Sequence, residues 1–241
     1  MMKENIEKRV QWIKEVLQSA KAKGVVLGMS GGKDCTLVGI LCKMAIDNVT
    51  GIIMPCEASS NYGADREDAL AVNKKYGIKT LEVDLTTIKK EFRKVLYPIS
   101  DSQYEMAYAN INPRLRMITL YNYAQREGYL VAGTGNRSER TMGYFTKWGD
   151  GAYDFNPIGD LTATEIFEML KFLDCPQNII TKAPSAGLIE GQTDEADFGV
   201  TYKDLDTYIL KGEATEEVKN IVDKAYNSTR HKRENPRIYP N

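Results

Sequence analysis

Short apolar runs alternate with longer amphipathic runs along most of the chain. The short runs predict buried β-strands at 24–29, 50–55, 79–85 and 129–134. The longer runs place apolar residues at helical spacing and predict helices at 2–20, 34–46, 63–76 and 86–95, and a long helix over 100–127 that Pro113 could interrupt. Further helices are expected at 162–173, 201–210 and 214–228.

Strands that alternate with helices predict βαβ units. We therefore expect an α/β fold with a doubly wound, mostly parallel sheet, helices on both faces, and one domain over 1–241. In such sheets ligands bind beyond the carboxyl ends of the strands. This rule places the chemistry at 28–36, 55–63, 84–87 and 133–139. The segment 183–200 lacks periodicity and is expected to be a long loop.

Composition and charge narrow the class of protein. The chain has 241 residues, of which 42% are hydrophobic, and its 32 Lys and Arg residues nearly balance 33 Asp and Glu residues. This balance argues against nucleic acid as a partner. No apolar run reaches the ~20 residues of a membrane helix, and the charged N-terminus has no signal core, so we expect a cytoplasmic protein without a membrane partner. The 4 cysteines form no C-x-x-C pair and are expected to be buried thiols in a reducing compartment.

The glycine-rich stretch "GMSGGKDCT" at 28–36 is the first candidate for chemistry. It is not a Walker A loop, because that motif needs Gly where Leu27 stands and Ser or Thr where Asp34 stands. Adjacent glycines still let backbone N–H groups approach a phosphate at a helix N-terminus, Ser30 can donate a hydroxyl, and Lys33 can add a mobile cation.

Asp34 is the unexpected residue in this stretch, because a carboxylate beside a phosphate repels it unless a metal ion lies between them. Asp34 is therefore a candidate Mg²⁺ ligand. A plain strand–turn–helix connection with Asp34 as the N-cap is the alternative interpretation.

"SGGKDC" resembles the S-G-G-x-D-S pyrophosphate loop of the ATP pyrophosphatases, enzymes of the adenine nucleotide alpha-hydrolase-like superfamily with a Rossmann-like fold. Five later blocks, in order, resemble ammonia-dependent NAD synthetase. They are "NINPRLRM" (110–117), "GTGNRSE" (133–139), "GYFTKWGDGAYDFNPIGDL" (143–161), "KAPSAGLIEGQTDEADFGVTYKDLD" (182–206) and "HKR" (231–233). The resemblance covers nearly the whole chain from residue 24 onward.

The resemblance implies an ATP-dependent ligase. The carboxylate of deamido-NAD (nicotinic acid adenine dinucleotide) attacks the α-phosphorus of ATP, and pyrophosphate leaves. Ammonia then attacks the resulting acyl-adenylate and gives NAD and AMP. The expected small-molecule partners are thus ATP, deamido-NAD and ammonia, with Mg²⁺ as cofactor, and the task of the protein is positioning and charge neutralisation.

The resemblance also assigns residues. ATP contacts fall on Gly28, Met29, Ser30, Gly31, Gly32, Lys33, Asp34, Cys35, Thr134, Lys182 and Ser185. Deamido-NAD contacts fall on Arg114, Lys147, Asp154, His231 and Lys232, the metal falls on Asp34 and Glu139, and the catalytic roles fall on Asp34 and Lys147. Simpler interpretations remain for several of these residues: Glu139 as a first-turn helix charge, Arg114 as a surface arginine, Asp154 as a turn residue, and His231 with Lys232 as a solvated basic tail.

The sequence departs from the family pattern at a few positions. Cys35 replaces the serine of the loop, and we expect it to stay a neutral thiol. Ala163 stands where the family has an ATP-binding lysine, whose charge Lys33 could replace. Pro113 enters the block before Arg114, and Ser185 replaces a threonine but keeps the hydroxyl. These changes affect the expected ATP affinity more than the reaction.

Two further expectations concern assembly. Members of the family are homodimers, and Tyr104, Met106 and Tyr108 could supply apolar contacts at the interface. The chain has no room for a glutaminase domain, so the expected nitrogen source is free ammonia. The alternatives are a sulfur-inserting tRNA adenylase, which would need further catalytic cysteines and a basic face, and a nucleotide sensor, which would be favoured if Asp34 and Glu139 were missing.

Overall fold

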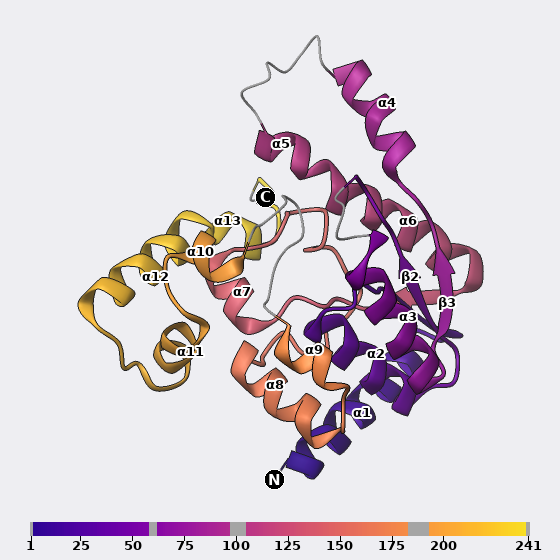
Figure 1. Ribbon diagram of the computed structural model, residues 1–241, viewed down its shortest axis with the longest axis horizontal. Helices are drawn as coiled ribbons and strands as arrows, with labels where there is room; N and C mark the ends of the chain where they lie inside the picture. The colour runs from indigo at the N-terminus through magenta and orange to yellow at the C-terminus, as the bar shows by residue number, and fades with distance from the viewer. Residues whose placement is uncertain (1, 58–61, 97–104, 183–192, 240–241) are drawn as a thin grey trace.

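A computed structural model describes residues 2–57, 62–96, 105–182 and 193–239, which form a parallel sheet with helices around it (Figure 1). The strands are β1 (Gly24–Gly28), β2 (Val49–Ile53), β3 (Lys79–Glu82) and β4 (Tyr129–Val131). Their order in the sheet is β3-β2-β1-β4, and every pair is parallel. Val25 of β1 pairs with Val49 on one side and with Leu130 on the other. The predicted parallel sheet is confirmed.

Helices cover both faces of the sheet, as predicted. Side chains of β1 alternate between two hydrophobic clusters because successive residues of a strand point to opposite faces. Val25 and Leu27 pack with α1 (Met2–Ser19), α2 (Lys33–Ala45), α3 (Ala64–Tyr76) and α8 (Ala163–Phe172). Val26 packs on the opposite face with α6 (Ile111–Glu127). The doubly wound arrangement follows from this alternation.

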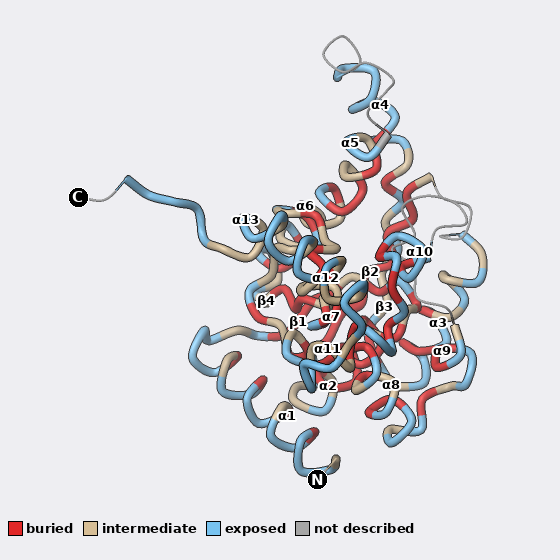
Figure 2. Tube along the Cα trace, turned by 90° about the vertical axis from the view of Figure 1, so that its left-hand side faces the viewer, coloured by how far each residue is buried: buried red, intermediate tan, exposed pale blue. Residues whose placement is uncertain are grey.

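Two groups of helices lie outside these layers. One group is α4 (Thr86–Leu96) and α5 (Glu105–Ala109), which stand together at one end of the molecule in Figures 1 and 2. The other group packs around a third hydrophobic cluster that includes Phe198, Leu205 and Val222. It consists of α7 (Arg137–Met142), α10 (Asp194–Phe198), α11 (Tyr202–Lys211) and α12 (Glu216–Ser228), and α13 (Arg230–Arg233) lies against α12.

Several element predictions need correction. The long helix expected over 100–127 is two helices, α5 and α6, and Pro113 lies within the first turn of α6 rather than at a break. Proline is tolerated there because a first-turn N–H has no partner inside the helix. Within the expected loop 183–200, residues 194–198 are helical, and 183–192 lie outside the described residues.

Four short helices were not predicted. They are α7, α10, α13 and α9 (Gln177–Thr181), and they have between 4 and 6 residues. A helical repeat of 3.6 residues cannot show in segments this short.

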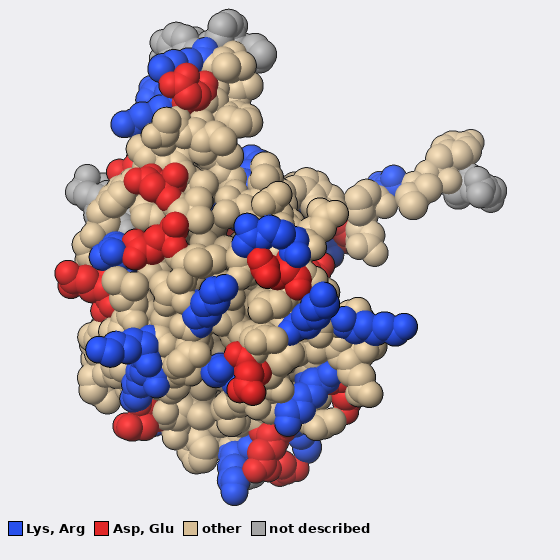
Figure 3. All heavy atoms as spheres, turned by 90° about the vertical axis from the view of Figure 1, so that its right-hand side faces the viewer, with Lys and Arg blue, Asp and Glu red and all other residues tan. Residues whose placement is uncertain are grey.

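The distribution of charged side chains on the surface agrees with the near-equal numbers of basic and acidic residues. Over the face shown in Figure 3, basic and acidic side chains are interspersed, as their near-equal numbers predict. Among the described residues, we find no helix with the length and apolar character that crossing a membrane requires. All 4 cysteines are buried and outside any disulfide, as expected.

The sheet order determines where a ligand can bind. The chain runs outward from β1 through β2 to β3, and then returns to place β4 on the other side of β1. In open α/β sheets ligands bind at such a switch point, which here lies beyond the carboxyl ends of β1 and β4. The segments that follow these two strands, 29–34 and 132–139, therefore approach each other.

Gly31 allows the turn after β1 to pack against α3. Its φ is +76°, and a Cβ at this position would lie 2.4 Å from the backbone oxygen of Asp65. Any other residue would meet both an unfavourable backbone conformation and a clash with backbone atoms. The turn therefore requires glycine at this position.

Gly31→Ala should destabilise the protein more than Gly199→Ala in urea unfolding. Gly199 has a similar φ of +70°, but an added Cβ there would meet nothing within 4 Å. The control should lose about 1–2 kcal/mol from the left-handed backbone alone, and Gly31→Ala should lose more because the clash adds to that cost. Equal losses would show that the contact with Asp65 does not constrain the turn.

Candidate active site

The glycine-rich turn leads directly from β1 into α2. Gly32 is the N-cap of α2, with φ −85° and ψ 168°, and its carbonyl oxygen accepts hydrogen bonds from Thr36 N at 3.2 Å and from Cys35 Sγ at 3.2 Å. Cys35 Sγ also lies 3.3 Å from Ser30 Oγ. The thiol of Cys35 thus braces the turn from inside, where it stands in place of the family's serine. The N-terminus of α2 and the adjacent glycines offer N–H groups to an anion.

One buried asparagine brings the two predicted metal carboxylates together. Asn136 Nδ2 donates to Asp34 Oδ1 at 3.0 Å, and Asn136 N donates to Glu139 Oε2 at 3.0 Å. Glu139 N donates in return to Asn136 Oδ1 at 2.9 Å, which completes a capping box at the start of α7. Glu139 is therefore a helix-capping residue as well as a neighbour of Asp34.

Asn136 was quoted in a sequence block but was not identified as a site residue. The sequence signal that could have found it is N-x-x-E at 136–139, directly after a predicted strand. Asn136 thus contacts both carboxylates, that of Asp34 through its side chain and that of Glu139 through its backbone N–H.

Lys33 differs from its expected role. We expected a mobile cation at the phosphate site, but the side chain is only 5% exposed and its Nζ lies 2.8 Å from Asp34 Oδ2. Burial opposes the charged form, but the charges of Asp34, Glu139 and Asp194 outweigh it and raise the pKa of Lys33 above its ordinary value. The expectation of a mobile Lys33 is wrong for this structure, because the lysine is a fixed internal charge.

The carboxyl group of Glu139 is disfavoured in its charged form by its partly buried position beside Asp34. Burial and, after it, the negative charge of Asp34 raise the pKa of Glu139 well above its ordinary value, and Lys33 offsets only part of this effect. A divalent cation between the two carboxylates would relieve their repulsion.

The donor set fits a hard cation such as Mg²⁺, which prefers one or two carboxylates together with water and phosphate oxygens. Within the described ranges, no group of three or more His, Cys, Asp and Glu side chains is arranged to hold a metal alone.

Lys182 lies beside the same turn. Its Nζ is 2.7 Å from Asp65 Oδ1 and 2.7 Å from Asp68 Oδ2, and Asp65 is the residue whose backbone Gly31 approaches. Thr134 follows β4 and is half-buried. Ser185, the other residue expected to bind ATP phosphates, lies outside the described residues.

The residues predicted to bind deamido-NAD form a second group. Arg114, exposed on α6, makes a long hydrogen bond of 3.4 Å to the carbonyl of Lys147, and Lys147 Nζ donates to the carbonyl of His231 on α13. Lys232 Nζ donates to the carbonyls of Gly143 at 2.7 Å and Phe145 at 2.9 Å. Lys232 is half-buried, and burial lowers its pKa. It therefore fastens α13 to the 143–151 loop and is not a solvated tail residue.

Asp154 contacts α6 further along that helix, at Tyr121. Its Oδ2 accepts from Val131 N at 2.7 Å, and its Oδ1 accepts from Tyr121 at 3.3 Å. Tyr121 is seven residues beyond Arg114, which is about two helical turns or roughly 10 Å. Asp154 and Arg114 thus mark two ends of one surface. The carboxylate of Asp154 therefore has a structural contact with the end of β4, which neither interpretation of this residue predicted.

Trp148 is a residue near this surface that the sequence argument did not single out. It follows Lys147, has φ +61°, is 54% exposed, and has its ring 5.5 Å from Lys147 Nζ. An exposed aromatic ring beside a cation can stack on a flat heterocycle. The sequence signal that could have identified this residue is a tryptophan placed between Lys147 and Gly149.

Comparisons with known proteins find relatives over nearly the whole chain. The model of a family described as NAD synthase matches residues 5–236. The NH(3)-dependent NAD(+) synthetase of Carboxydothermus hydrogenoformans is 45% identical over 98% of this chain and 96% of its own length. That of Finegoldia magna is 46% identical over 94% and 92%.

Solved structures agree as well. The NMN synthetase of Francisella tularensis has a TM-score of 0.94 at 34% identity, over 100% of this chain and 99% of its own. The NH3-dependent NAD synthetase of Campylobacter jejuni has a TM-score of 0.83 at 30% identity, over 100% of both chains.

The raised pKa of Glu139 predicts a pH-dependent cost in the metal-free protein. A carboxyl group with a higher pKa in the folded state opposes folding as the pH rises from its unfolded value of 4.5. Glu139→Gln should therefore raise Tm at pH 8, by about 2–4 °C for each 1 kcal/mol gained, and the gain should shrink toward pH 4. Thermal unfolding between these pH values measures it.

Glu165→Gln is the matched control, because Glu165 closes the same type of capping box at the start of α8. It should give no pH-dependent gain. A Tm difference for Glu139→Gln that stays constant from pH 4 to pH 8 would contradict the assigned repulsion.

Proposed function

The chain belongs to the NAD synthase family, and from this premise we propose which of its residues perform the family's reaction. The protein is a ligase that catalyses the ATP-dependent amidation of deamido-NAD to NAD with ammonia. The observation that carries the assignment of residues is the meeting of Asp34 and Glu139 at Asn136, beyond the ends of β1 and β4.

Asp34 and Glu139 hold Mg²⁺ in this proposal. The ion, when bound, neutralises charge on the ATP phosphates as pyrophosphate departs. The N–H groups of Gly31, Gly32 and the first turn of α2 donate hydrogen bonds to phosphate oxygens, which the close glycine backbone supports. Lys182, now paired with two aspartates of α3, is near enough to this turn to exchange one of them for a phosphate oxygen.

The dinucleotide binds along the surface from Arg114 to Asp154. Arg114, Lys147 and α13 form one chain of hydrogen bonds, and the fork of Arg114 suits a phosphate group. Lys147 would place a cation near the carbonyl oxygen on which negative charge develops when ammonia attacks. The ring of Trp148 offers a flat face beside it for the nicotinate.

A second candidate is amidation of the mononucleotide instead of the dinucleotide. The NMN synthetase of Francisella tularensis has a higher TM-score, 0.94, than the NAD synthetase of Campylobacter jejuni, 0.83. The chemistry at the carboxylate is the same for both substrates, which differ only in the adenylate half. The relative kcat/KM for deamido-NAD and for nicotinic acid mononucleotide distinguishes the two activities.

We also propose that the enzyme is a homodimer. Helix α4 buries only Lys89, whereas Ile88 is 47%, Phe92 44% and Val95 72% exposed at helical spacing. An apolar helix face of this kind fits a partner surface. Met106 on α5 is 54% exposed and can contribute.

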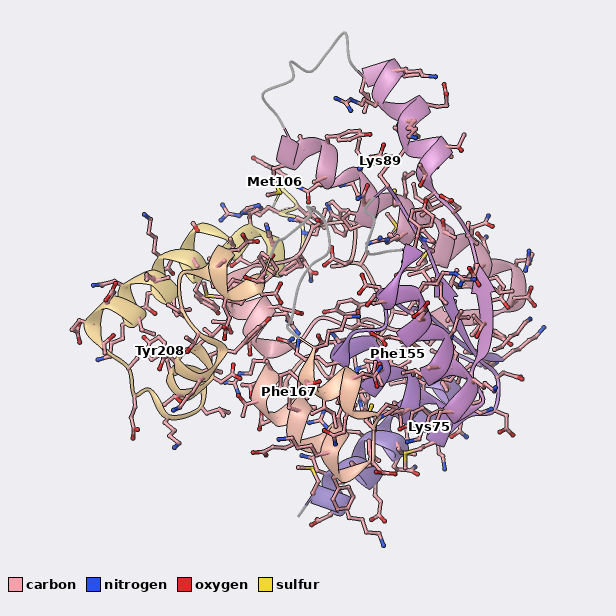
Figure 4. The ribbon with its side chains drawn as sticks, viewed as in Figure 1. Lys75, Lys89, Met106, Phe155, Phe167 and Tyr208 are labelled. Atoms are coloured by element: carbon pink, nitrogen blue, oxygen red, sulfur yellow. The ribbon has the colours of Figure 1, made fainter. Side chains whose placement is uncertain are left out.

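The structure does not support an interface role for Tyr104 or Tyr108, the other two residues suggested for it. Tyr104 lies outside the described residues. Tyr108 is an internal contact: Lys89, labelled in Figure 4, lies with its Nζ 4.1 Å from the Tyr108 ring centroid, and Tyr108 donates to Glu57.

A cytoplasmic location is the last part of the proposal. The 4 buried thiols, none in a disulfide, fit a reducing compartment.

Asp34→Asn should lower kcat/KM for ATP by at least about 100-fold, the cost expected when one charge-stabilising group is lost. The assay mixes protein, ATP, Mg²⁺, ammonium and either nucleotide substrate, and follows AMP, pyrophosphate and the amide product by chromatography. Asp47→Asn, at an exposed position two residues beyond the end of α2, should keep wild-type activity. Unchanged pyrophosphate release by Asp34→Asn would refute the role given to Asp34.

Replacing Phe92 and Val95 of α4 by Glu should halve the mass measured by light scattering after size exclusion. The two charges would lie on the apolar face, whose burial drives the association. Lys90→Glu, on the polar side of the same helix, should leave the dimer intact. A monomeric wild-type protein, or a dimer that survives both changes, would contradict an interface at α4.

A further inference from the structure

Lys33 is in an unusual place for a lysine. It is the first residue of α2, where the helix dipole disfavours positive charge, and its side chain is turned inward until only 5% of it is exposed. A buried ammonium needs compensating charges. A lysine in the first turn of a helix could instead extend into water, so its burial here needs a reason.

The surroundings of Lys33 supply these charges. Its Nζ lies 2.8 Å from Asp34 Oδ2, and the carboxylates of Glu139 and Asp194 also act on its charge. The rings of Phe167 and Tyr202 lie with their centroids 5.8 Å and 5.3 Å from Nζ. Phe167, labelled in Figure 4, belongs to α8, and Tyr202 begins α11. Lys33 thus joins the glycine-rich turn to the C-terminal helices.

The charges around Lys33 do not balance. When all three are ionised, the carboxylates of Asp34, Glu139 and Asp194 exceed the single ammonium by two negative charges, which one divalent cation would balance. Both oxygens of Asp34 already accept hydrogen bonds, Oδ2 from Lys33 and Oδ1 from Asn136 at 3.0 Å. A metal ion bound to Asp34 must therefore share this carboxylate with an ammonium that repels it.

We propose that Lys33 is a positioning residue that acts through Asp34, as a tethered cation that weakens the binding of free divalent metal and makes tight metal binding depend on ATP. Without nucleotide, Lys33 holds Asp34 in place and competes with the ion for it. The phosphates of ATP add negative charge to the same site, so ammonium and metal ion can then be held together. This inference rests on the proposed metal site of Asp34 and Glu139.

The test measures the dissociation constant of Mn²⁺ by electron paramagnetic resonance, with MnCl₂ alone and with MnCl₂ plus a non-hydrolysable α,β-methylene analogue of ATP. Lys33→Met should bind Mn²⁺ without nucleotide at least about tenfold more tightly than wild type, and the analogue should improve its affinity less. Lys33→Arg keeps the charge and should behave as wild type. Equal or weaker Mn²⁺ binding by Lys33→Met would overturn the inference.

Three controls make the outcome specific. Lys43→Met removes an outward-facing lysine of the same helix, paired with Asp47, and should leave Mn²⁺ binding unchanged. Lys33→Gln is the second variant if Lys33→Met does not fold, and it should shift affinity in the same direction. In either Lys33 variant, MnCl₂ alone should raise Tm more than it raises the Tm of wild type, which a purely structural role for Lys33 would not produce.

Asp34→Asn separates the two proposals. If it abolishes Mn²⁺ binding while Lys33→Met binds as wild type does, the metal site stands and only the role of Lys33 fails. If Asp34→Asn binds Mn²⁺ as well as wild type, the proposed metal site is wrong and the inference falls with it.

Discussion

Two like charges held close together are the constraint on which the rest of this structure depends. Asp34 follows β1 and Glu139 follows β4, and only the strand order β3-β2-β1-β4 brings the ends of these strands next to each other. Asn136 fixes the pair, because its side-chain amide donates to Asp34 and its backbone N–H donates to Glu139. The repulsion that remains is a cost to folding, and it is the kind of cost that active sites retain because a bound ion or substrate removes it.

Residues of the C-terminal helices α10 and α11 interact with the same charges. Tyr202 donates to Asp194 at 2.8 Å, and burial, followed by the charges of Glu139, Asp194 and Asp34, raises the pKa of its hydroxyl, which therefore remains a donor. Phe167 and Tyr202 place two rings near Lys33. The third hydrophobic cluster is thus connected to the glycine-rich turn through polar and cation–π contacts as well as through packing.

Sequence patterns predicted the sheet, its two helical layers and the approach of the segments that follow β1 and β4, because each depends on long periodic segments or on strand order. Periodicity did not reveal α7, which positions Glu139, because a helix of 6 residues shows no repeat; only the interpretation of Glu139 as a first-turn charge pointed to a helix there. They also missed the direction of the Lys33 side chain, which depends on Asp194 and Tyr202, far away in the sequence. Pro113 was misjudged because its effect depends on whether it starts a helix or interrupts one. Long-range contacts decide such details, and local patterns do not contain them.

The fastening of α13 has a practical consequence for handling the protein. Lys232 bonds to two carbonyls of the loop that follows α7, and the carbonyl of His231 accepts from Lys147, so α13 supports the surface proposed for the dinucleotide. Residues 235–239 extend away from the body directly after it (Figure 2). A purification tag fused there would pull on this support, whereas one placed before α1 would hang from the opposite end of the molecule. The N-terminus is therefore the better attachment point for immobilised or fluorescent forms of the enzyme.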